Sequence, residues 1–138
     1  MSEGAASAEG VEVLLAQAQA ARQQAYVPYS RFSVGAAVAT DAGVFSGANV
    51  ENASYGLSIC AERVAAASAV AAGARRIEAI AVVGGSVRPT PPCGACRQFL
   101  YEFNPDMLVL SVTPGGERKQ WGLAELLVDG FGRSDLGK

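Results

Sequence analysis

The three cysteines of the chain and one glutamate have the spacing of a metal site. Cys93 and Cys96 are separated by two residues, and Glu62 follows Cys60 after one residue. A Cys-x-x-Cys pair can bind one metal ion from adjacent turns, and a third thiolate gives three protein ligands with one tetrahedral position open. An open position is typical of a catalytic zinc, because it admits a water whose pKa zinc lowers toward about 7. The cysteines therefore predict one catalytic Zn²⁺ in each subunit.

Glu62 is the natural proton carrier beside this predicted site. The chain contains no histidine, which excludes Ser-His-Asp and Cys-His catalysis, HExxH metalloproteases and Cys/His zinc fingers. General acid or base chemistry must then use a carboxylate, Lys, Tyr or Cys. Glu62 is near enough to reach a water on the metal without binding the metal. We expect it to take the water's proton, pass it to a ring nitrogen and help an amine leave.

Two arginines, Arg63 and Arg97, lie next to the predicted ligands in the sequence. Zinc with three thiolates carries a net negative charge, which weakens the metal as a Lewis acid. We hypothesise that both arginines donate hydrogen bonds to the sulfurs and offset this charge. A helical arginine elsewhere is more often a solvated surface charge, and it is the adjacent thiolates that favour the hypothesis here.

The elements that must position these residues alternate between helical and extended patterns. One predicted helix, over 60–72, begins at Cys60, and another, over 93–103, begins at Cys93. A helix N terminus presents free N–H groups and the positive end of the helix dipole, which lower the pKa of a thiol. Further helices are predicted over 9–25 and 123–127, and strands over 33–40, 44–50, 77–83, 107–112 and 118–121. This order predicts an α/β fold in which helices cover both faces of a mixed sheet.

The composition predicts one domain over residues 1–138, with a disordered tail over 1–8. Half of the 138 residues are hydrophobic and 17% are charged, which excludes an intrinsically disordered chain. The net charge of -2 offers no basic surface to nucleic acid, and no apolar stretch is long enough to span a membrane. An odd number of cysteines favours a reducing compartment, so we expect a cytoplasmic protein.

Several motifs, taken in order, resemble those of a known enzyme family. The run Cys60-Ala61-Glu62, followed by Pro92-Cys93-Gly94-Ala95-Cys96, is similar to the zinc deaminase signature in its version with Cys in place of His. The segments 26–32 (YVPYSRF), 34–37 (VGAA), 49–56 (NVENASYG) and 126–136 resemble the small homotetrameric cytidine deaminases of the three-cysteine zinc type. The resemblance covers nearly the whole chain from residue 26 onward.

The resemblance implies a three-layer α/β/α sandwich around a mixed five-stranded sheet. It implies a hydrolase that converts cytidine and 2′-deoxycytidine to uridine and 2′-deoxyuridine and releases ammonia, in pyrimidine salvage. It further implies a homotetramer whose active sites are shared between subunits.

The resemblance also assigns roles to residues that bind the substrate. Phe32 would stack on the pyrimidine, and Asn49 and Glu51 would hydrogen-bond the ribose, Glu51 at its 3′-hydroxyl. The main chain around Ala61 and the carboxylate of Glu62 would contact the edge of the base. An aromatic face and a carboxylate acceptor suit a neutral nucleoside, so we expect nucleosides rather than nucleotides as substrates.

Three more residues would come from neighbouring subunits. Ala53 and Tyr55 would contribute from one neighbour, and Phe131 would reach in and close the pocket around the base. Considered without the resemblance, Phe131 is an exposed aromatic that more often anchors a tail or an interface. Phe32, Asn49 and Glu51 would likewise be interpreted as core, turn and surface residues.

Three alternatives remain open at this point. A blasticidin S-type aminonucleoside deaminase would use the same zinc chemistry on another substrate. An enzyme that edits cytosine in nucleic acid is disfavoured by the net charge and the lack of a basic stripe. A zinc-stabilised assembly module without catalytic activity would bind the metal and leave cytidine unchanged.

Overall fold

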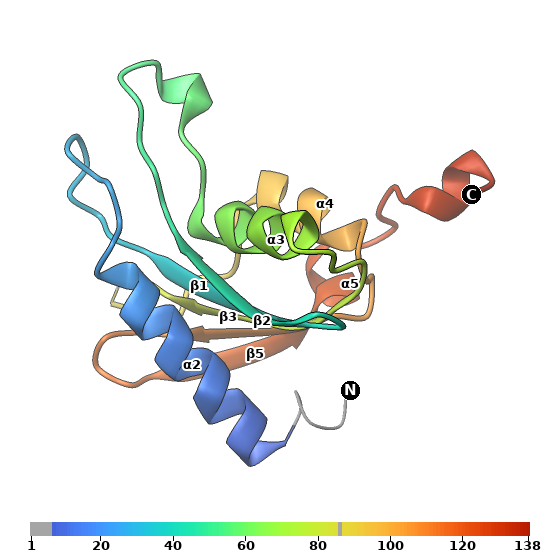
Figure 1. Ribbon diagram of the computed structural model, residues 1–138, viewed down its shortest axis with the longest axis horizontal. Coiled ribbons are helices and arrows are strands. Elements are labelled where there is room, and N and C mark those ends of the chain that lie inside the picture. Colours follow the sequence, from blue (N-terminus) through green and yellow to red (C-terminus); the bar gives the residue numbers. More distant parts are fainter. Residues whose placement is uncertain (1–6, 86) are drawn as a thin grey trace.

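A mixed sheet of five strands forms the centre of the computed structural model, which describes residues 7–85 and 87–138 (Figure 1). The strands are β1 (Gly35–Thr40), β2 (Gly43–Ala48), β3 (Ile77–Val83), β4 (Leu108–Val112) and β5 (Arg118–Gly122). Their order in the sheet is β2-β1-β3-β4-β5. β3 and β4 are parallel, and the other neighbouring pairs are antiparallel. The prediction of a mixed sheet opened by a hairpin is therefore confirmed.

Helices cover both faces of this sheet, as Figure 1 shows. They are α2 (Ala8–Arg22), α3 (Ala61–Ala71), α4 (Gly94–Tyr101) and α5 (Leu123–Leu126), with short 3-10 helices η1 (Tyr55–Leu57) and η2 (Arg133–Leu136). α2 buries Leu14, Leu15 and Ala18 against alternate strand residues such as Ala37 and Ala81. α3, α4 and α5 pack on the opposite face. Because successive strand side chains point to opposite faces, the result is the predicted three-layer α/β/α sandwich.

Two glycines let helices approach the β1–β2 hairpin more closely than any other residue would allow. A Cβ atom at Gly35 would lie 2.0 Å from the Ala18 carbonyl oxygen of α2. A Cβ atom at Gly47 would lie 2.6 Å from the Ala65 amide nitrogen of α3. The hairpin is therefore held between α2 and α3 at backbone contact on both faces.

Two long connections, residues 23–34 and 49–60, extend away from the body of the fold (Figure 1). Isolated bridges join Tyr26 to Val50 and Val50 to Ile59. The predicted helix over 9–25 ends at Arg22, because the Tyr26 amide donates to the Asn49 carbonyl at 3.0 Å instead of continuing the helix. The predicted strands over 33–40 and 44–50 are also shorter than expected. Residues 33–34 and 49–50 leave the sheet and belong to the two connections.

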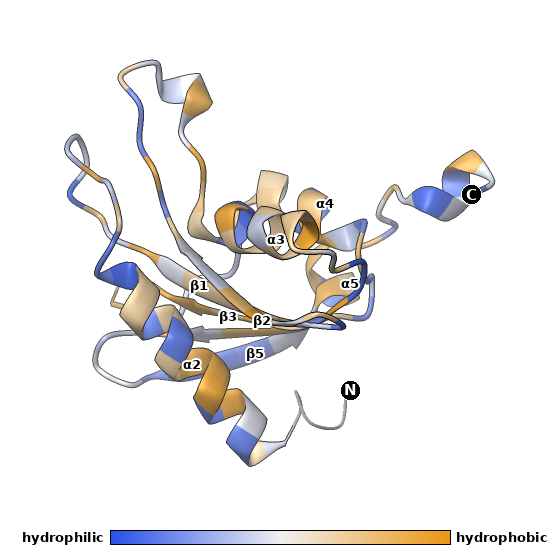
Figure 2. Ribbon diagram, in the orientation of Figure 1, coloured by the Kyte–Doolittle hydropathy of each residue, from blue (hydrophilic) through white to orange (hydrophobic). Residues whose placement is uncertain are grey.

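The ends of the chain differ from the sequence prediction in two respects. Ser7 caps α2 by accepting a hydrogen bond from the Gly10 amide at 3.0 Å, and Ala8 is already helical. Residues 1–6 of the predicted tail lie outside the described residues. The 3-10 helix at 133–136 was not predicted, and Figure 2 shows it as largely hydrophilic. Within the described parts of the chain, no helix has both the length and the hydropathy to cross a bilayer.

Candidate active site

The three cysteines converge at the N-terminal ends of two helices. Cys60 is the N-cap residue of α3, Cys93 is the N-cap residue of α4, and Cys96 is buried in the first turn of α4. Their Sγ atoms lie within 4.8 Å of one another, and Cys60 Sγ and Cys93 Sγ are 3.7 Å apart. Tetrahedral zinc with Zn–S bonds of about 2.3 Å separates its sulfurs by about 3.8 Å. The cluster therefore fits zinc, and its thiols are free rather than joined as a disulfide.

The charges around the sulfurs favour a thiolate before any metal binds. Hydrogen bonds from the Cys96 thiol and from Arg63 lower the pKa of the Cys60 thiol to about 5, although partial burial opposes this. The hydrogen bond to Cys60 and burial raise the pKa of Cys96. The Arg63 Nη2 atom lies 3.7 Å from Cys60 Sγ. Its Nε atom is buried without a hydrogen-bond partner among the described residues, which fits a site whose remaining thiols become thiolates when a metal binds.

Arg97 does not have the partners predicted for it. Its Nε atom donates to the Pro92 carbonyl at 2.7 Å, and its Nη1 atom donates to the Leu126 carbonyl at 2.8 Å. These bonds tie the segment just before α4 to the end of α5, whose last carbonyl groups have no partner within the helix. The hypothesis that Arg97 bonds to the sulfurs is therefore wrong, whereas Arg63 does lie within hydrogen-bond distance of Cys60 Sγ.

Glu62 lies directly beside the cluster, on the first turn of α3. The side chain is only 6% exposed, and it lines a cavity together with Cys60 and Cys93. Burial raises the pKa of Glu62 to about 7, and the Cys60 thiolate adds to this effect. A carboxyl group with a pKa near neutrality can both accept and donate a proton, which is what a proton shuttle requires.

The cavity beside Glu62, which we call the inner cavity, has a volume of about 220 Å³. It is lined by residues from several elements, among them Phe32, Asn49, Ala61, Glu62 and Cys93. Sequence reasoning missed its far wall, which Val82, Ser111 and Val112 form at the carboxyl ends of β3 and β4. The parallel pairing of these two strands was the available signal, because ligands bind at the carboxyl ends of such strands.

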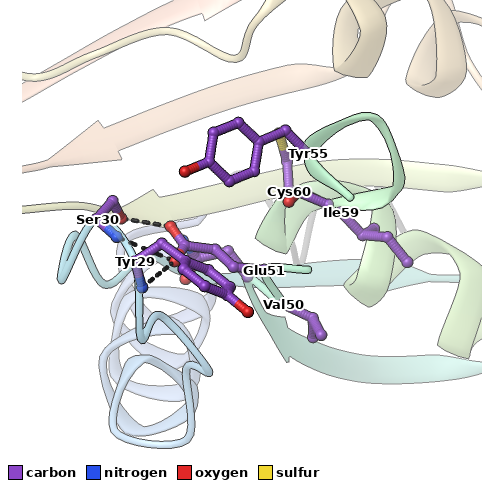
Figure 3. Close-up of a pocket in the computed structure, with 9 residues that line it drawn as sticks. Tyr29, Ser30, Val50, Glu51, Tyr55, Ile59 and Cys60 are labelled. Atoms are coloured by element: carbon purple, nitrogen blue, oxygen red, sulfur yellow. Dashed lines mark hydrogen bonds between the residues drawn. The ribbon is translucent and has the colours of Figure 1, made fainter. Parts of the chain in front are cut away.

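A second cavity, the outer cavity, has a volume of about 380 Å³ and is formed by the two long connections (Figure 3). Glu51 accepts hydrogen bonds there from the Tyr29 amide at 3.0 Å, the Ser30 amide at 3.1 Å and the Ser30 hydroxyl. The bond from the Ser30 hydroxyl is the main reason that the pKa of Glu51 is lowered. Asn49 and Cys60 line both cavities, so the two are adjacent compartments of one site.

Asn49 has a positioning role that the sequence did not reveal. Its Nδ2 atom donates to the Phe32 carbonyl at 2.9 Å, and its Oδ1 atom accepts from the Val34 amide at 2.9 Å. Asn49 therefore holds the irregular segment that carries Phe32 against the inner cavity.

The residues predicted to come from neighbouring subunits are exposed in the single chain. Ala53 lies on the 49–60 connection, and Tyr55 is 75% exposed at the rim of the outer cavity, with its ring centroid 6.1 Å from that of Tyr29. Phe131 is 57% exposed on the C-terminal segment and lines neither of the two cavities in the described chain. The Gln98 side chain donates to the Phe131 carbonyl at 2.9 Å. Their contribution to another subunit stays a prediction.

Comparisons with known proteins agree with this arrangement. A family model described as "Cytidine and deoxycytidylate deaminase zinc-binding region" matches residues 9–112. The chain is 48% identical over 127 residues to a protein named cytidine deaminase from Halalkalibacterium halodurans, covering 91% of this chain and 96% of the relative. It is 45% identical over 128 residues to a cytidine deaminase from Sporosarcina psychrophila, covering 91% of this chain and 94% of that one.

The solved structures that superpose on this chain are also described as cytidine deaminases. A cytidine deaminase from Burkholderia pseudomallei superposes with a TM-score of 0.83 at 50% identity, covering 87% of this chain and 98% of that chain. The cytidine deaminase of Mycobacterium tuberculosis superposes with a TM-score of 0.77 at 42% identity, covering 89% of this chain and 98% of the other. The matched region includes the three cysteines and Glu62. The chain therefore belongs to the cytidine and deoxycytidylate deaminase family, whose zinc-binding region it carries in a three-cysteine form.

Proposed function

We propose that this chain is a zinc-dependent hydrolase that deaminates cytidine and 2′-deoxycytidine, giving uridine or 2′-deoxyuridine and ammonia. The observation that carries the proposal is the buried Glu62 carboxyl beside three thiols spaced for zinc, at the edge of a cavity that Phe32 also lines. The relatives named cytidine deaminase support this choice of substrate over an aminonucleoside antibiotic.

Glu62 does the proton work in this proposal. Zinc held by Cys60, Cys93 and Cys96 would supply Lewis acidity that makes water a nucleophile at neutral pH. The water oxygen forms a bond to C4 of the base, and the C4–N4 bond breaks. Glu62 takes one proton from the attacking water and delivers it to N3. It then takes the remaining proton of the same oxygen and transfers it to N4, so that a C4 carbonyl forms and ammonia leaves. Arg63 offsets the charge of the thiolates through its contact with Cys60.

The two cavities divide the substrate between them. We assign the base to the inner cavity, where Phe32 offers an aromatic face and the main chain around Ala61 lies near the edge of the base. We assign the ribose to the outer cavity, where Glu51 can accept a hydrogen bond from a sugar hydroxyl and Asn49 lies at the junction. The outer cavity has no arginine or lysine among its lining residues, which supports nucleosides over nucleotides.

We propose further that the active unit is a cytoplasmic homotetramer with shared sites. The 49–60 connection carries exposed hydrophobic side chains, including Tyr55, Leu57 and Ile59. Contiguous exposed apolar residues are typical of a protein interface. In the proposal Ala53, Tyr55 and Phe131 complete the sites of neighbouring subunits. The free thiols are consistent with the reducing conditions of the cytoplasm.

The direct test follows the ultraviolet absorbance of cytidine with the purified protein. Turnover should stop when a chelator removes zinc and should return when Zn²⁺ is added back. A parallel assay compares kcat/KM for cytidine with kcat/KM for blasticidin S, and we expect cytidine to be preferred. A protein that holds zinc but leaves cytidine unchanged would instead be an assembly module.

A further inference from the structure

Ser30 lies between the two residues that the proposed function assigns to the sugar and to the base. Its hydroxyl donates to Glu51 Oε2, and its amide donates to Glu51 Oε1 at 3.1 Å (Figure 3). The same hydroxyl oxygen accepts a hydrogen bond from the Phe32 amide at 3.0 Å. A serine hydroxyl has one proton to donate and lone pairs to accept, so a single oxygen atom can serve both partners at once.

The backbone around Ser30 is shaped for this double contact. Arg31 has a φ angle of 60°, which is the left-handed conformation that residues other than glycine seldom adopt. The resulting tight turn brings the Phe32 amide within hydrogen-bond distance of the Ser30 hydroxyl. Serine hydroxyls often bond to a backbone group two residues away in such turns. An uncommon conformation of this kind persists where surrounding contacts determine it. Here these contacts include the hydrogen bond from the Phe32 amide to the Ser30 hydroxyl and one from the Arg31 amide to the Val27 carbonyl at 3.0 Å.

The segment that carries Phe32 belongs to no helix or strand, so side chains must hold it. Ser30 binds the Phe32 amide, and Asn49 binds the Phe32 carbonyl at 2.9 Å. The Arg22 Nε atom donates to the Ser33 carbonyl at 3.1 Å. Of these three side chains, only Ser30 also contacts Glu51 in the described hydrogen bonds.

We infer that Ser30 is a positioning residue that couples sugar recognition by Glu51 to the placement of Phe32 against the base. The inference rests on the proposed function, because it takes the sugar role of Glu51 and the base role of Phe32 from it. Ser30 acts through these two residues and does not itself react. Loss of its hydroxyl should therefore weaken both contacts to the nucleoside and leave the metal cluster intact.

The experiment compares Ser30→Ala, Ser30→Thr and the control Ser46→Ala, which changes an exposed serine of β2. Each variant is assayed on cytidine and on 3′-deoxycytidine, which lacks the hydroxyl assigned to Glu51. A hydrogen bond to a charged group is worth about tenfold to a hundredfold. We expect Ser30→Ala to lower kcat/KM for cytidine by about that factor, mainly through KM. The loss should be smaller for 3′-deoxycytidine, on which only the contact of Phe32 with the base can still be weakened.

Ser30→Thr keeps the hydroxyl and should recover most of the lost kcat/KM, while Ser46→Ala should behave as the wild-type protein does. Zinc content and Tm should match those of the wild-type protein in all three variants. Equal losses on the two substrates, no rescue by threonine, or an effect in kcat alone would overturn the inference. If the wild-type protein does not deaminate cytidine, the proposed function itself is wrong. The assay of the wild-type protein therefore distinguishes this failure from a failure of the inference about Ser30.

Discussion

The two cavities of the site are built in different ways. The residues of the inner cavity that carry the chemistry lie on the starts of α3 and α4, and its far wall lies at the ends of β3 and β4. The outer cavity lies between two irregular connections and depends on a few hydrogen bonds between side chains and backbone. Rigid elements position catalytic groups more accurately than loops do. Under the proposed function, the rigid elements of this fold would position the reacting groups, and the loops would select the substrate.

The two carboxylates show the same division. Burial raises the pKa of Glu62 to about 7, whereas hydrogen bonds from Ser30 and from backbone amides lower the pKa of Glu51. Two groups of the same chemical type are thereby adapted to different tasks. One can move protons near neutral pH, and the other stays ionised as an acceptor.

The largest effect should follow from removing one of the three sulfurs of the predicted zinc site. Cys96→Ala takes one sulfur from the buried part of the cluster, so the variant should lose its zinc and show no detectable turnover. Metal content per chain and deamination of cytidine measure the two effects. Retention of one zinc per chain would show that Cys96 is not a ligand.

Glu62→Gln should separate metal binding from proton transfer. Glutamine has nearly the same shape but cannot shuttle a proton, so kcat should fall by about 10²–10⁴ while zinc stays bound. Steady-state kinetics and metal analysis of the same preparation check this result. Normal turnover would overturn the role given to Glu62.

A change in the outer cavity should act on binding more than on the chemical step. Glu51→Gln removes a charged acceptor, so kcat/KM for cytidine should fall by about tenfold to a hundredfold, mostly through KM. Because the pKa of Glu51 is lowered, the carboxylate stays ionised at every pH above its usual range. The loss in kcat/KM caused by Glu51→Gln should therefore be the same at about pH 5 and at about pH 8, because Glu62 titrates alike in both proteins. A loss that disappears toward about pH 5 would contradict the assignment.

The smallest effect is expected at a carboxylate outside both cavities. Asp41 accepts hydrogen bonds from the amides of Arg75 at 3.0 Å and Arg76 at 3.3 Å, and these bonds lower its pKa. A lowered folded pKa stabilises the fold above the unfolded pKa, and this contribution is lost as the pH falls through the folded value. Asp41→Asn should lower Tm slightly at neutral pH, by an amount that shrinks in acid. Its kcat/KM should equal that of the wild-type protein.

Much of the inner cavity could be predicted from the sequence, because its parts are local patterns. The helix patterns predicted that Cys60 and Cys93 each lie at the start of a helix, where the structure places them. The strand over 77–83 was predicted with its observed bounds. The outer cavity is different, since Ser30 and Asn49 act through backbone groups that only the folded connections bring near. The error at Arg97 has the same origin, because its partner carbonyl at Leu126 lies 29 residues away.

Gly35 and Gly47, which face α2 and α3 from opposite faces of the β1–β2 hairpin, have a consequence for protein engineering. Alanine is the smallest possible replacement, yet its methyl group would collide with the backbone of α2 at position 35, and with the Ala65 amide nitrogen and the Val64 side chain of α3 at position 47. Glycine-to-alanine exchange, a common route to thermostable variants, is therefore closed at these two positions. Libraries built on this scaffold should keep both residues fixed and place their diversity in the connections instead.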